Sequence, residues 1–304
     1  IMNHFVFVRK HNRFVAALLS AVLLLTLLAG CAKAGSASAS GSETTLEKAR
    51  RLGYVTVGFA QEKPYAYQTE DGKLTGEAVD VARTILKELG IDEMRGELTE
   101  FGSLIPGLNA KRYDMVTAGM FITPDRAKEV SFANPEFTIG EAIAVQKGNP
   151  LNLHSYKDIA ENPTAKIAVP AGAIEYDYLV SANVPKARIV IVPNITAALS
   201  ALQSDRAHAL TATGPSVQSA IDTSGSADIE RVSDFQQPVV DGKSVRGYGA
   251  TAFRKADKDF VSAFNKGLEE LKKSGKLLEI LKKFGFTETE LPGSVTTEKL
   301  LESF

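Results

Sequence analysis

The sequence contains a single cysteine, Cys31, among 304 residues. An internal disulfide is therefore excluded, and so is a cluster of thiolate ligands for a metal ion. Acidic and basic side chains nearly balance, with 36 Asp and Glu against 35 Lys and Arg and a formal net charge of −1. This balance leaves no broad basic surface for nucleic acid. The fold must rest on its hydrophobic core, and the chain is long enough to build two such cores.

Histidine is scarce as well, with four residues in the chain. His154 and His208 stand alone in the sequence, and we interpret both as structural or exposed residues. The sequence also lacks a glycine-rich phosphate loop, a nucleophile elbow and the spacing of metal ligands. We therefore expect no cofactor, no bound metal ion, no catalytic residue and no enzymatic activity.

The N-terminal segment has the features of a targeting signal. Basic residues precede an apolar run, Phe14–Leu28, which is too short for a comfortable membrane span. The run leads into Leu28-Ala29-Gly30-Cys31, and small residues directly before a cysteine resemble a bacterial lipoprotein signal. We expect residues 1–30 to be cleaved and Cys31 to carry a lipid that anchors the chain to the cell membrane, outside the cytoplasm. A plain signal peptide with an incidental cysteine is the alternative.

A small, polar stretch follows this signal. Residues 31–43 include AKAGSASASGSE, which cannot bury enough apolar area to fold. We expect this stretch to be a flexible tether between the anchor and the folded part of the chain.

From Glu47 onward, short apolar strands alternate with amphipathic helices. This alternation predicts mostly parallel sheets with helices on both faces. We expect strands at Tyr54–Ala60, Glu97–Glu100, Tyr113–Ala118, Ile139–Gln146, Lys166–Val169, Arg188–Val192, Ala207–Ala212, Asp228–Val232 and Tyr248–Phe253. The expected helices include Gly76–Leu89, Leu104–Ala110, Ile174–Ala182, Ile195–Ser204, Phe260–Ser274 and Leu277–Phe284.

The order of these elements predicts two lobes. We expect the chain to cross between them twice, near Asn134–Thr138 and near Arg246–Tyr248. Lobe one would comprise residues 44–137 and 248–304, and lobe two residues 138–247. Two connecting strands between compact lobes form a hinge that can close on a ligand.

The stretch Gly119–Arg126 (GMFITPDR) follows an expected strand and enters an expected helix. Thr123-Pro124 is typical of a helix start, with proline at the first helical position. The guanidinium of Arg126 offers a planar fork of donors that matches a carboxylate in two parallel hydrogen bonds. Phe121 places an aromatic ring nearby. A carboxylate clamp beside an aromatic face indicates a small zwitterionic ligand with a diffuse positive charge.

Longer motifs across residues 47–290 resemble one known family. They are VTVGFA with Pro64-Tyr65, DGKLTGEAVDVA, FGSLIPGLNAKRYDMVTAGMFITPDRAKEVSFANP, AVPAG and GYGATAFRK. These segments resemble the bacterial extracellular solute-binding proteins of the polar amino-acid class (family 3), which feed ABC importers. The resemblance implies an α/β, two-lobed periplasmic-binding-protein type II fold (Venus-flytrap), with mixed, mostly parallel sheets joined by two hinge strands.

Within this family, the chain most resembles the binding proteins for ectoine and hydroxyectoine. FGSLIPGL, GMFITPDR, the loop Glu62–Tyr65 and GEAIAVQKGNP carry this narrower resemblance. It implies an ectoine or hydroxyectoine ligand, docking onto the membrane subunits of an ABC transporter, and a monomeric protein.

The resemblance also assigns roles to single residues. Arg126 has the position of the arginine that grips the ligand carboxylate, and Gly119 and Phe121 have positions that contact the ligand. Thr213 stands where amino-acid binders typically have an aspartate for the α-ammonium group, and Ala173 stands where Thr or Ser is frequent. Both departures remove a polar group that an ordinary amino acid would use.

The remaining candidates form the acid and the aromatic cage of an ectoine binder. The resemblance assigns Glu62 to the ligand cation and the rings of Tyr65, Phe101 and Phe121 to its flat face. The residues alone leave other interpretations open: Tyr65 and Phe101 as ordinary core aromatics, Glu62 as a solvated loop acid, and Arg126 as a surface residue of its helix.

Alternatives for the ligand also stay open. A polar amino acid, or another compatible solute such as proline betaine, would keep the class of protein and change the specificity. Some cyclohexadienyl dehydratases use the same fold, and Glu62 is the one candidate for the general acid that such an enzyme would need.

Overall fold

The computed structural model describes residues 43–240 and 242–304. The expected signal peptide, the lipidation site Cys31 and residues 31–42 of the expected tether lie outside the described residues. Within the described residues, no helix combines the length and the apolar character that a bilayer crossing requires.

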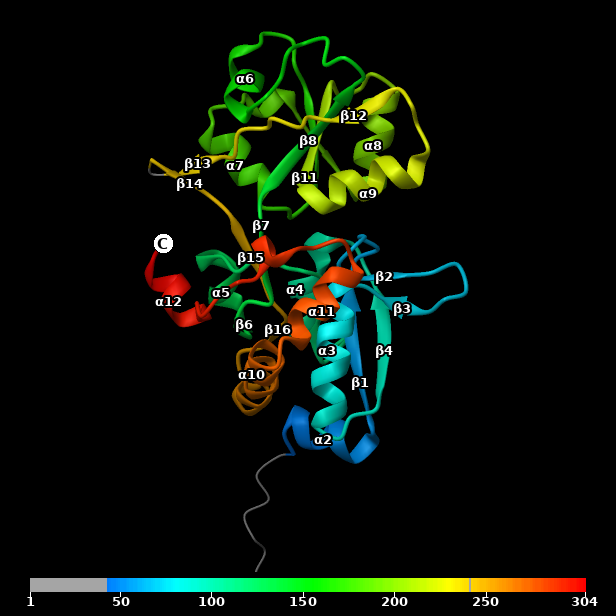
Figure 1. The fold of residues 1–304 in the computed structure, drawn as a ribbon, viewed down its shortest axis with the longest axis vertical. Coiled ribbons are helices and arrows are strands. Elements are labelled where there is room, and N and C mark those ends of the chain that lie inside the picture. The colour runs from blue at the N-terminus through cyan, green and yellow to red at the C-terminus, as the bar shows by residue number, and fades with distance from the viewer. Residues whose placement is uncertain (1–42, 241) are drawn as a thin grey trace, which may run out of the picture. The chain divides into compact units, whose positions relative to one another are not determined.

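The first five-stranded sheet has the order β4-β1-β5-β16-β6 (Figure 1). Its strands are β1 (Tyr54–Phe59), β4 (Glu93–Leu98), β5 (Met115–Val116), β6 (Val130–Phe132) and β16 (Ala252–Arg254). Side chains from α3 (Glu77–Glu88), α10 (Lys258–Lys273) and α11 (Lys276–Lys283) form a hydrophobic core with one face. Those from α4 (Leu104–Asn109) and α12 (Thr297–Glu302) form a second core with the other. The two cores lie on opposite faces of the sheet, because successive side chains of a strand point to opposite faces. In β16, Ala252 belongs to the second core and Phe253 to the first.

The second five-stranded sheet has the order β10-β9-β11-β8-β12. Its strands are β8 (Glu141–Gln146), β9 (Ile167–Pro170), β10 (Ile189–Val192), β11 (Ala209–Thr213) and β12 (Ile229–Arg231). One face packs with α8 (Ile195–Gln203) and α9 (Gly214–Ser224), and the other with α6 (Tyr156–Glu161) and α7 (Glu175–Ser181). The expectation of helices on both faces of the sheets is confirmed.

The two sheets share one strand pattern. In the first sheet, β1 pairs in parallel with β4 and β5, and β16 runs antiparallel to β5 and β6. In the second, β9 pairs in parallel with β10 and β11, and β8 runs antiparallel to β11 and β12. Each sheet therefore has four strands in one direction and one reversed strand. The reversed strand is the first that the chain forms after it crosses from the other sheet.

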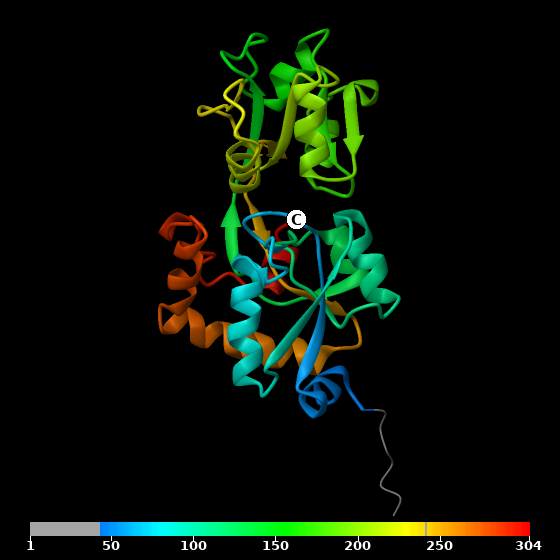
Figure 2. The same ribbon diagram turned by 90° about the vertical axis from the view of Figure 1, so that its right-hand side faces the viewer.

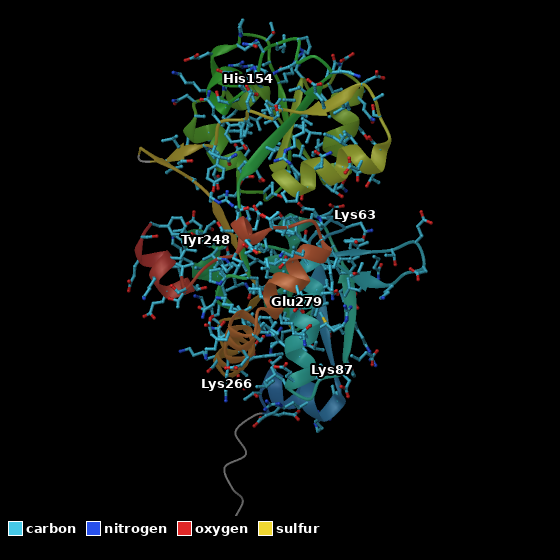
Figure 3. All side chains as sticks on the ribbon, viewed as in Figure 1. Lys63, Lys87, His154, Tyr248, Lys266 and Glu279 are labelled. Carbon is cyan, nitrogen blue, oxygen red and sulfur yellow. The ribbon has the colours of Figure 1, made fainter. Side chains whose placement is uncertain are left out.

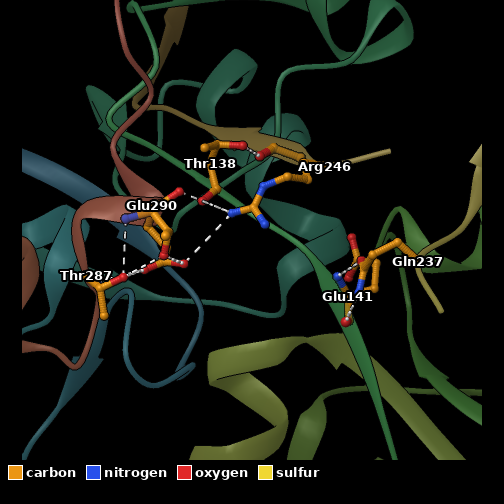
Figure 4. A network of polar contacts seen from close by, with 8 residues as sticks. Thr138, Glu141, Gln237, Arg246, Thr287 and Glu290 are labelled. Carbon is orange, nitrogen blue, oxygen red and sulfur yellow. Dashed lines mark hydrogen bonds and ion pairs between the residues drawn. The ribbon is translucent and has the colours of Figure 1, made fainter. Parts of the chain in front are cut away.

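Two short strands form these crossings, β7 (Phe137–Ile139) and β15 (Gly247–Gly249), and they pair antiparallel (Figure 1). The guanidinium of Arg246, beside β15, donates a 3.2 Å hydrogen bond to the carbonyl oxygen of Thr138 and lies 3.8 Å from the carboxylate of Glu290 (Figure 4). Figure 2 shows the same strands from a second direction. They lie where the sequence predicts the crossings, and the residue boundaries of the lobes stay a prediction.

The remaining elements are short. They are α2 (Thr45–Leu52), α5 (Pro124–Glu129), the hairpin of β2 (Tyr67–Gln68) and β3 (Leu74–Thr75), and the hairpin of β13 (Val239–Val240) and β14 (Lys243–Ser244). The helix starts follow capping chemistry. Thr123 caps α5 by accepting the Arg126 N–H, and Pro124 occupies the first turn as predicted.

Some predicted bounds are wrong. The strand predicted at Glu97–Glu100 is β4 at Glu93–Leu98, because its pairing with β1 runs from Tyr54↔Glu93 to Phe59↔Leu98. This edge strand is mostly polar and exposed, so it carries no apolar signal. The single return strand predicted at Tyr248–Phe253 is divided into β15 and β16, which pair with different partners.

A pair of buried acids lies where the crossing strands join the first sheet. Glu77, the first residue of α3, and Glu136, the residue before β7, are both fully buried. Glu136 accepts hydrogen bonds from the N–H (2.9 Å) and the hydroxyl (2.7 Å) of Thr251. Neither carboxylate oxygen of Glu77 has a hydrogen-bond partner among the described residues.

The environment of these acids favours their neutral forms. Burial, followed by repulsion from Glu136 and Asp80, raises the pKa of Glu77 well above its ordinary value. Burial also raises the pKa of Glu136 from 4.5 to about 7, against the opposing effects of Thr251 and Lys272. Between pH 4.5 and about 7, the folded protein therefore binds more protons than the unfolded chain. The free energy of unfolding must fall as the pH rises through this range.

We predict that wild-type protein loses roughly 3 kcal/mol of unfolding free energy between pH 4.5 and 7 relative to Glu136→Gln, because glutamine keeps an acceptor for Thr251 and cannot ionise. Urea unfolding at several pH values measures the difference. Glu279→Gln is the matched control, since Glu279 is an exposed acid of α11 (Figure 3). Equal pH slopes for wild type and Glu136→Gln would contradict the prediction.

Candidate ligand-binding site

A cavity lies at the ends of strands from both sheets. It is lined by Glu62, Tyr65, Phe101, Ala118, Gly119, Phe121, Arg126, Pro170, Ala173, Ile174, Glu175, Ala212 and Thr213. All eight residues that the sequence predicts for ligand binding are in this set. The structure thus brings the predicted residues together, and their role in binding stays a prediction.

The topology explains why these residues meet. Glu62 and Tyr65 follow β1, Phe101 follows β4, and Gly119 and Phe121 follow β5. Since these three strands are parallel neighbours, their carboxyl ends lie at one edge of the first sheet. On the second sheet, Ala173 follows β9, and Thr213 ends β11. Open α/β sheets bind ligands at such strand ends.

Tyr65 serves the core and the cavity at once. Its side chain is buried, and its ring stacks on Phe137 of β7 at 5.1 Å between centroids. Its hydroxyl donates a 2.8 Å hydrogen bond to the hydroxyl of Thr213 on the second sheet. The interpretation of Tyr65 as a core aromatic therefore describes part of its environment, and it also connects the two sides of the cavity.

Gly119 is required by the shape of this wall. Its φ of +62° lies in the left-handed region. A Cβ atom there would come within 2.6 Å of the Tyr65 ring. Two residues on, Phe121 pairs with Gly249 of β15 in an isolated antiparallel bridge. The crossing strand thereby holds the Phe121 ring at the cavity.

Arg126 spans the cavity from the first turn of α5. Its Nη1 donates to the carbonyl oxygen of Phe121 at 2.8 Å, and its Nη2 donates to that of Gly172 in the second sheet's loop at 2.9 Å. Its guanidinium carbon lies 5.4 Å from the centroid of the half-buried Phe101 ring. Arg126 is therefore part of the cavity rather than a residue of the outer helix surface.

Glu62 is an acid that lines the same cavity as Arg126. The hydroxyl of Ser216, in the first turn of α9, donates a 2.6 Å hydrogen bond to its carboxylate. Burial raises the pKa of Glu62 from 4.5 to about 7, the bond from Ser216 opposes this, and repulsion from Glu175 adds to it. Glu62 is thus a half-buried acid of the cavity wall rather than a fully solvated loop residue.

Two further acids, which the sequence analysis missed, come from the second sheet. Glu175 begins α7 and lines the cavity, and Glu141 begins β8 behind it; their exposed fractions are 4% and 3%. Burial and then repulsion and hydrogen bonding from Glu175 raise the pKa of Glu141 well above its ordinary value. The backbone of Glu141 is fixed by the amide of Gln237, which accepts its N–H at 2.7 Å and donates to its carbonyl at 2.9 Å (Figure 4).

The cavity is therefore richer in acids than in bases. Three carboxyl groups accompany the guanidinium of Arg126, whose pKa burial lowers and Glu175 restores in part. Such a site suits a ligand that brings a carboxylate for the arginine and a cationic or donor group for the acids. Among the described residues, no group of three or more His, Cys, Asp or Glu side chains is placed to hold a metal ion.

Comparison with known proteins assigns the chain to a family. The family model for bacterial extracellular solute-binding proteins, family 3, matches residues 55–288. The chain belongs to this family. It is 37% identical over 284 residues to a probable amino-acid ABC transporter periplasmic-binding protein of Sinorhizobium fredii, a match that covers 92% of this chain and 91% of that protein. The predicted two-lobed fold and the predicted family are confirmed.

Solved structures of this family resemble the chain over most of its length. EhuB in complex with hydroxyectoine is 36% identical, with a TM-score of 0.77 and coverage of 85% of this chain and 98% of that one. An ancestral amino-acid-binding protein, described as a precursor of cyclohexadienyl dehydratase, is 28% identical, with a TM-score of 0.68 and coverage of 79% and 99%. As a family 3 member, the protein is an extracytoplasmic solute-binding protein.

Proposed function

We propose that this solute-binding protein captures ectoine or 5-hydroxyectoine between its two lobes for an ABC importer. The single observation that carries the proposal is the meeting of Arg126, Glu62 and the rings of Tyr65, Phe101 and Phe121 around one cavity. The 36% identity to EhuB, solved with hydroxyectoine, supports the choice of ligand.

The chemistry of the ligand matches these groups. Ectoine is a cyclic amidinium carboxylate, whose positive charge is spread over the planar N–C–N unit of its ring. Arg126 would hold the carboxylate, and Glu62 would accept the ring N–H hydrogens. Each aromatic face against the cation contributes roughly 0.5–2 kcal/mol, and a charge-assisted pair with Arg126 roughly 2–3 kcal/mol. After the cost of immobilising the ligand, these contributions fit a binding free energy of about −8 kcal/mol, which corresponds to a dissociation constant in the micromolar range.

Thr213 favours this ligand over an ordinary amino acid. Its hydroxyl already accepts a hydrogen bond from the Tyr65 hydroxyl, and its side chain supplies no negative charge for a primary ammonium group. A delocalised cation needs no point charge at this position and is held by ring faces instead.

The protein would act as a monomer, held at the membrane by a lipid on Cys31 and joined to it by residues 31–43. Its loaded form would dock onto the membrane subunits of the importer. The S. fredii relative is named as the binding component of an amino-acid ABC transporter, which supports this partner.

A second candidate ligand is a cationic amino acid such as arginine. The surplus of acids in the cavity favours it, because Glu62 and Glu175 could each pair with one of its two cationic groups. The proximity of Arg126 to Glu175 opposes it, since a second ligand cation would be repelled there.

An enzymatic role as a cyclohexadienyl dehydratase has one observation in its favour. A carboxyl group whose pKa is raised to about 7, as for Glu62, can donate a proton at neutral pH. Turnover of prephenate or arogenate by the purified protein would establish this activity, and the proposal of a binding protein predicts none.

We predict that isothermal titration of the purified protein gives micromolar affinity for ectoine and 5-hydroxyectoine and weaker binding of arginine, glutamine and glycine betaine. The physical reason is that Arg126, Glu62 and the ring faces match a flat amidinium carboxylate. Tight binding of arginine or glutamine without heat from ectoine would overturn the proposed ligand.

The aromatic cage can be tested at Phe101, the half-buried ring beside Arg126. Phe101→Leu keeps an apolar side chain and removes the π face, so ectoine affinity should fall about 2- to 30-fold. Phe304→Leu is the control, because Phe304 is 65% exposed and does not line the cavity. Unchanged affinity of Phe101→Leu would remove Phe101 from the cage.

The pKa of Glu62 predicts the pH dependence of binding. The ligand cation pairs with the ionised acid, so binding must displace the proton that Glu62 holds below about pH 7. Ectoine affinity should be about tenfold weaker at pH 6 than at pH 8. Glu62→Gln should bind more weakly and lose most of this dependence. A wild-type affinity that is constant from pH 6 to 8 would show that Glu62 does not pair with the ligand.

A further inference from the structure

Two loops touch at the rim of the cavity, one from each sheet. The first follows β4 and contains a single 3₁₀ turn, Phe101–Ser103, and the second, Ala171–Ala173, follows β9. A Cβ atom on Gly172 would lie 2.7 Å from the Cα atom of Gly102, and one on Gly102 would lie 3.2 Å from the carbonyl oxygen of Ala171. The two backbones therefore meet with no side chain between them. The contact lies at the cavity, because each loop also contributes a residue to its lining.

The two glycines are needed for different reasons. Gly172 has a φ of +79°, in the left-handed region, so its own backbone favours glycine. Gly102 has no such φ, and it is exposed at the end of its turn. Outside its own helical turn and chain neighbours, the three heavy atoms nearest to a Cβ atom on Gly102 all belong to Ala171 and Gly172. Since glycine costs conformational entropy in a helical turn, the feature that it provides here is the close approach of the opposite loop.

Two polar contacts join the sheets near the same point. The side-chain amide of Asn194, which follows β10, donates to both carboxylate oxygens of Glu100 at 3.4 Å. Its amide oxygen accepts the N–H of Ala197 at 3.0 Å and so caps α8, which fixes the orientation of the side chain. Nη2 of Arg126 donates to the carbonyl oxygen of Gly172. Loops from two neighbouring parallel strands of the second sheet, β9 and β10, thus both contact the first sheet at this rim.

We propose that Gly102 is a positioning residue for lobe closure. Without a side chain at this position, the turn after β4 packs directly on Gly172, and the cavity closes over a ligand. The hydrogen bonds between Glu100 and Asn194 stabilise the closed rim. The inference rests on the capture of a ligand between the lobes. It holds for any ligand that they enclose, so it does not depend on ectoine.

Closure is one step of a coupled equilibrium. A ligand first contacts the open lobes and the lobes then close, so the measured affinity combines the two steps. A side chain at position 102 would be overpacked against the opposite loop only in the closed form. It should therefore weaken the binding of every ligand by the same factor. This factor should appear in the dissociation rate, because entry into the open form is unchanged.

Stopped-flow kinetics and titration calorimetry of the full protein with ectoine, 5-hydroxyectoine and arginine test this assignment. Gly102→Ala places a methyl group 3.2 Å from the opposite carbonyl oxygen and should weaken the binding of each probe about threefold. Gly102→Val should weaken it about tenfold or more. In both variants the dissociation rate constant should rise by the same factor, and the association rate constant should change less than about twofold. The order of the three affinities should stay as in wild type.

Ser103→Val is the matched control. Ser103 is the next residue of the same turn, is exposed and does not line the cavity. This variant should keep the wild-type affinity and rates within about twofold. Small-angle X-ray scattering with saturating ligand reports on the lobes directly: wild type and Ser103→Val should contract, and Gly102→Val should contract less. Thermal unfolding without ligand verifies that each variant is folded.

The polar contact at the rim has its own test. Asn194→Asp keeps the cap of α8 and replaces the amide donor with a second acid against Glu100. Repulsion between the two carboxylates should raise the dissociation constant about threefold at low ionic strength, and by less at high ionic strength. Adding Glu100→Gln should restore the wild-type affinity, because the glutamine amide donates to the aspartate. Equal affinity of Asn194→Asp and wild type at low ionic strength would remove this contact from the closed rim.

The outcomes separate this inference from the proposed function. A wild-type affinity and dissociation rate in Gly102→Val would overturn the role of Gly102, whichever probe binds. A changed order of the three affinities would also overturn it, because the new side chain would then touch the ligand. Slower association at an unchanged dissociation rate would overturn it as well and assign position 102 to ligand entry. If wild-type protein binds arginine tightly and neither ectoine, the proposed ligand falls, and the arginine kinetics of Gly102→Val still decide the role in closure.

Discussion

The removal of ionic side chains from water is the constraint on which the rest of this structure depends. One guanidinium and three carboxyl groups are withdrawn into or behind a single cavity, and each loses hydration that other groups must replace. Arg126 recovers part of it from two carbonyl oxygens, and Glu62 from the hydroxyl of Ser216. Because these contacts join groups from both sheets, the stability of this conformation and the charge balance of the cavity are linked.

The strand order of the two sheets brings these charged groups together at one cavity. Each sheet places its parallel strand ends at the cavity, and each receives the crossing chain as its one reversed strand. The crossing strands also contact the site directly, since Phe121 pairs with Gly249 and the Tyr65 ring stacks on Phe137. Movement at the crossings would therefore shift two walls of the cavity together. The buried pair Glu77 and Glu136 lies beside the same strands. The protonation of these two acids therefore takes place next to the strands that connect the lobes.

The sequence predicts the parts of the site that local chemistry encodes. A proline-led helix start, an arginine in its first turn and a glycine with aromatic neighbours identify Gly119–Arg126, and family motifs add Glu62, Tyr65 and Phe101. Glu175 could not be predicted, because an acid in the first turn of a helix is ordinary and gives no sign of facing inward. Ser216 and Glu141 depend likewise on how α9 and β8 pack. The bounds of β4 were missed because a polar edge strand has no apolar pattern.

A crystal structure of the protein with bound ectoine tests the central claim most directly. The account predicts the ligand carboxylate on the guanidinium of Arg126, the amidinium on Glu62, and the ring held against Phe101, Tyr65 and Phe121. An ectoine molecule bound with its carboxylate on another residue, or with its ring away from all three aromatic side chains, would contradict it.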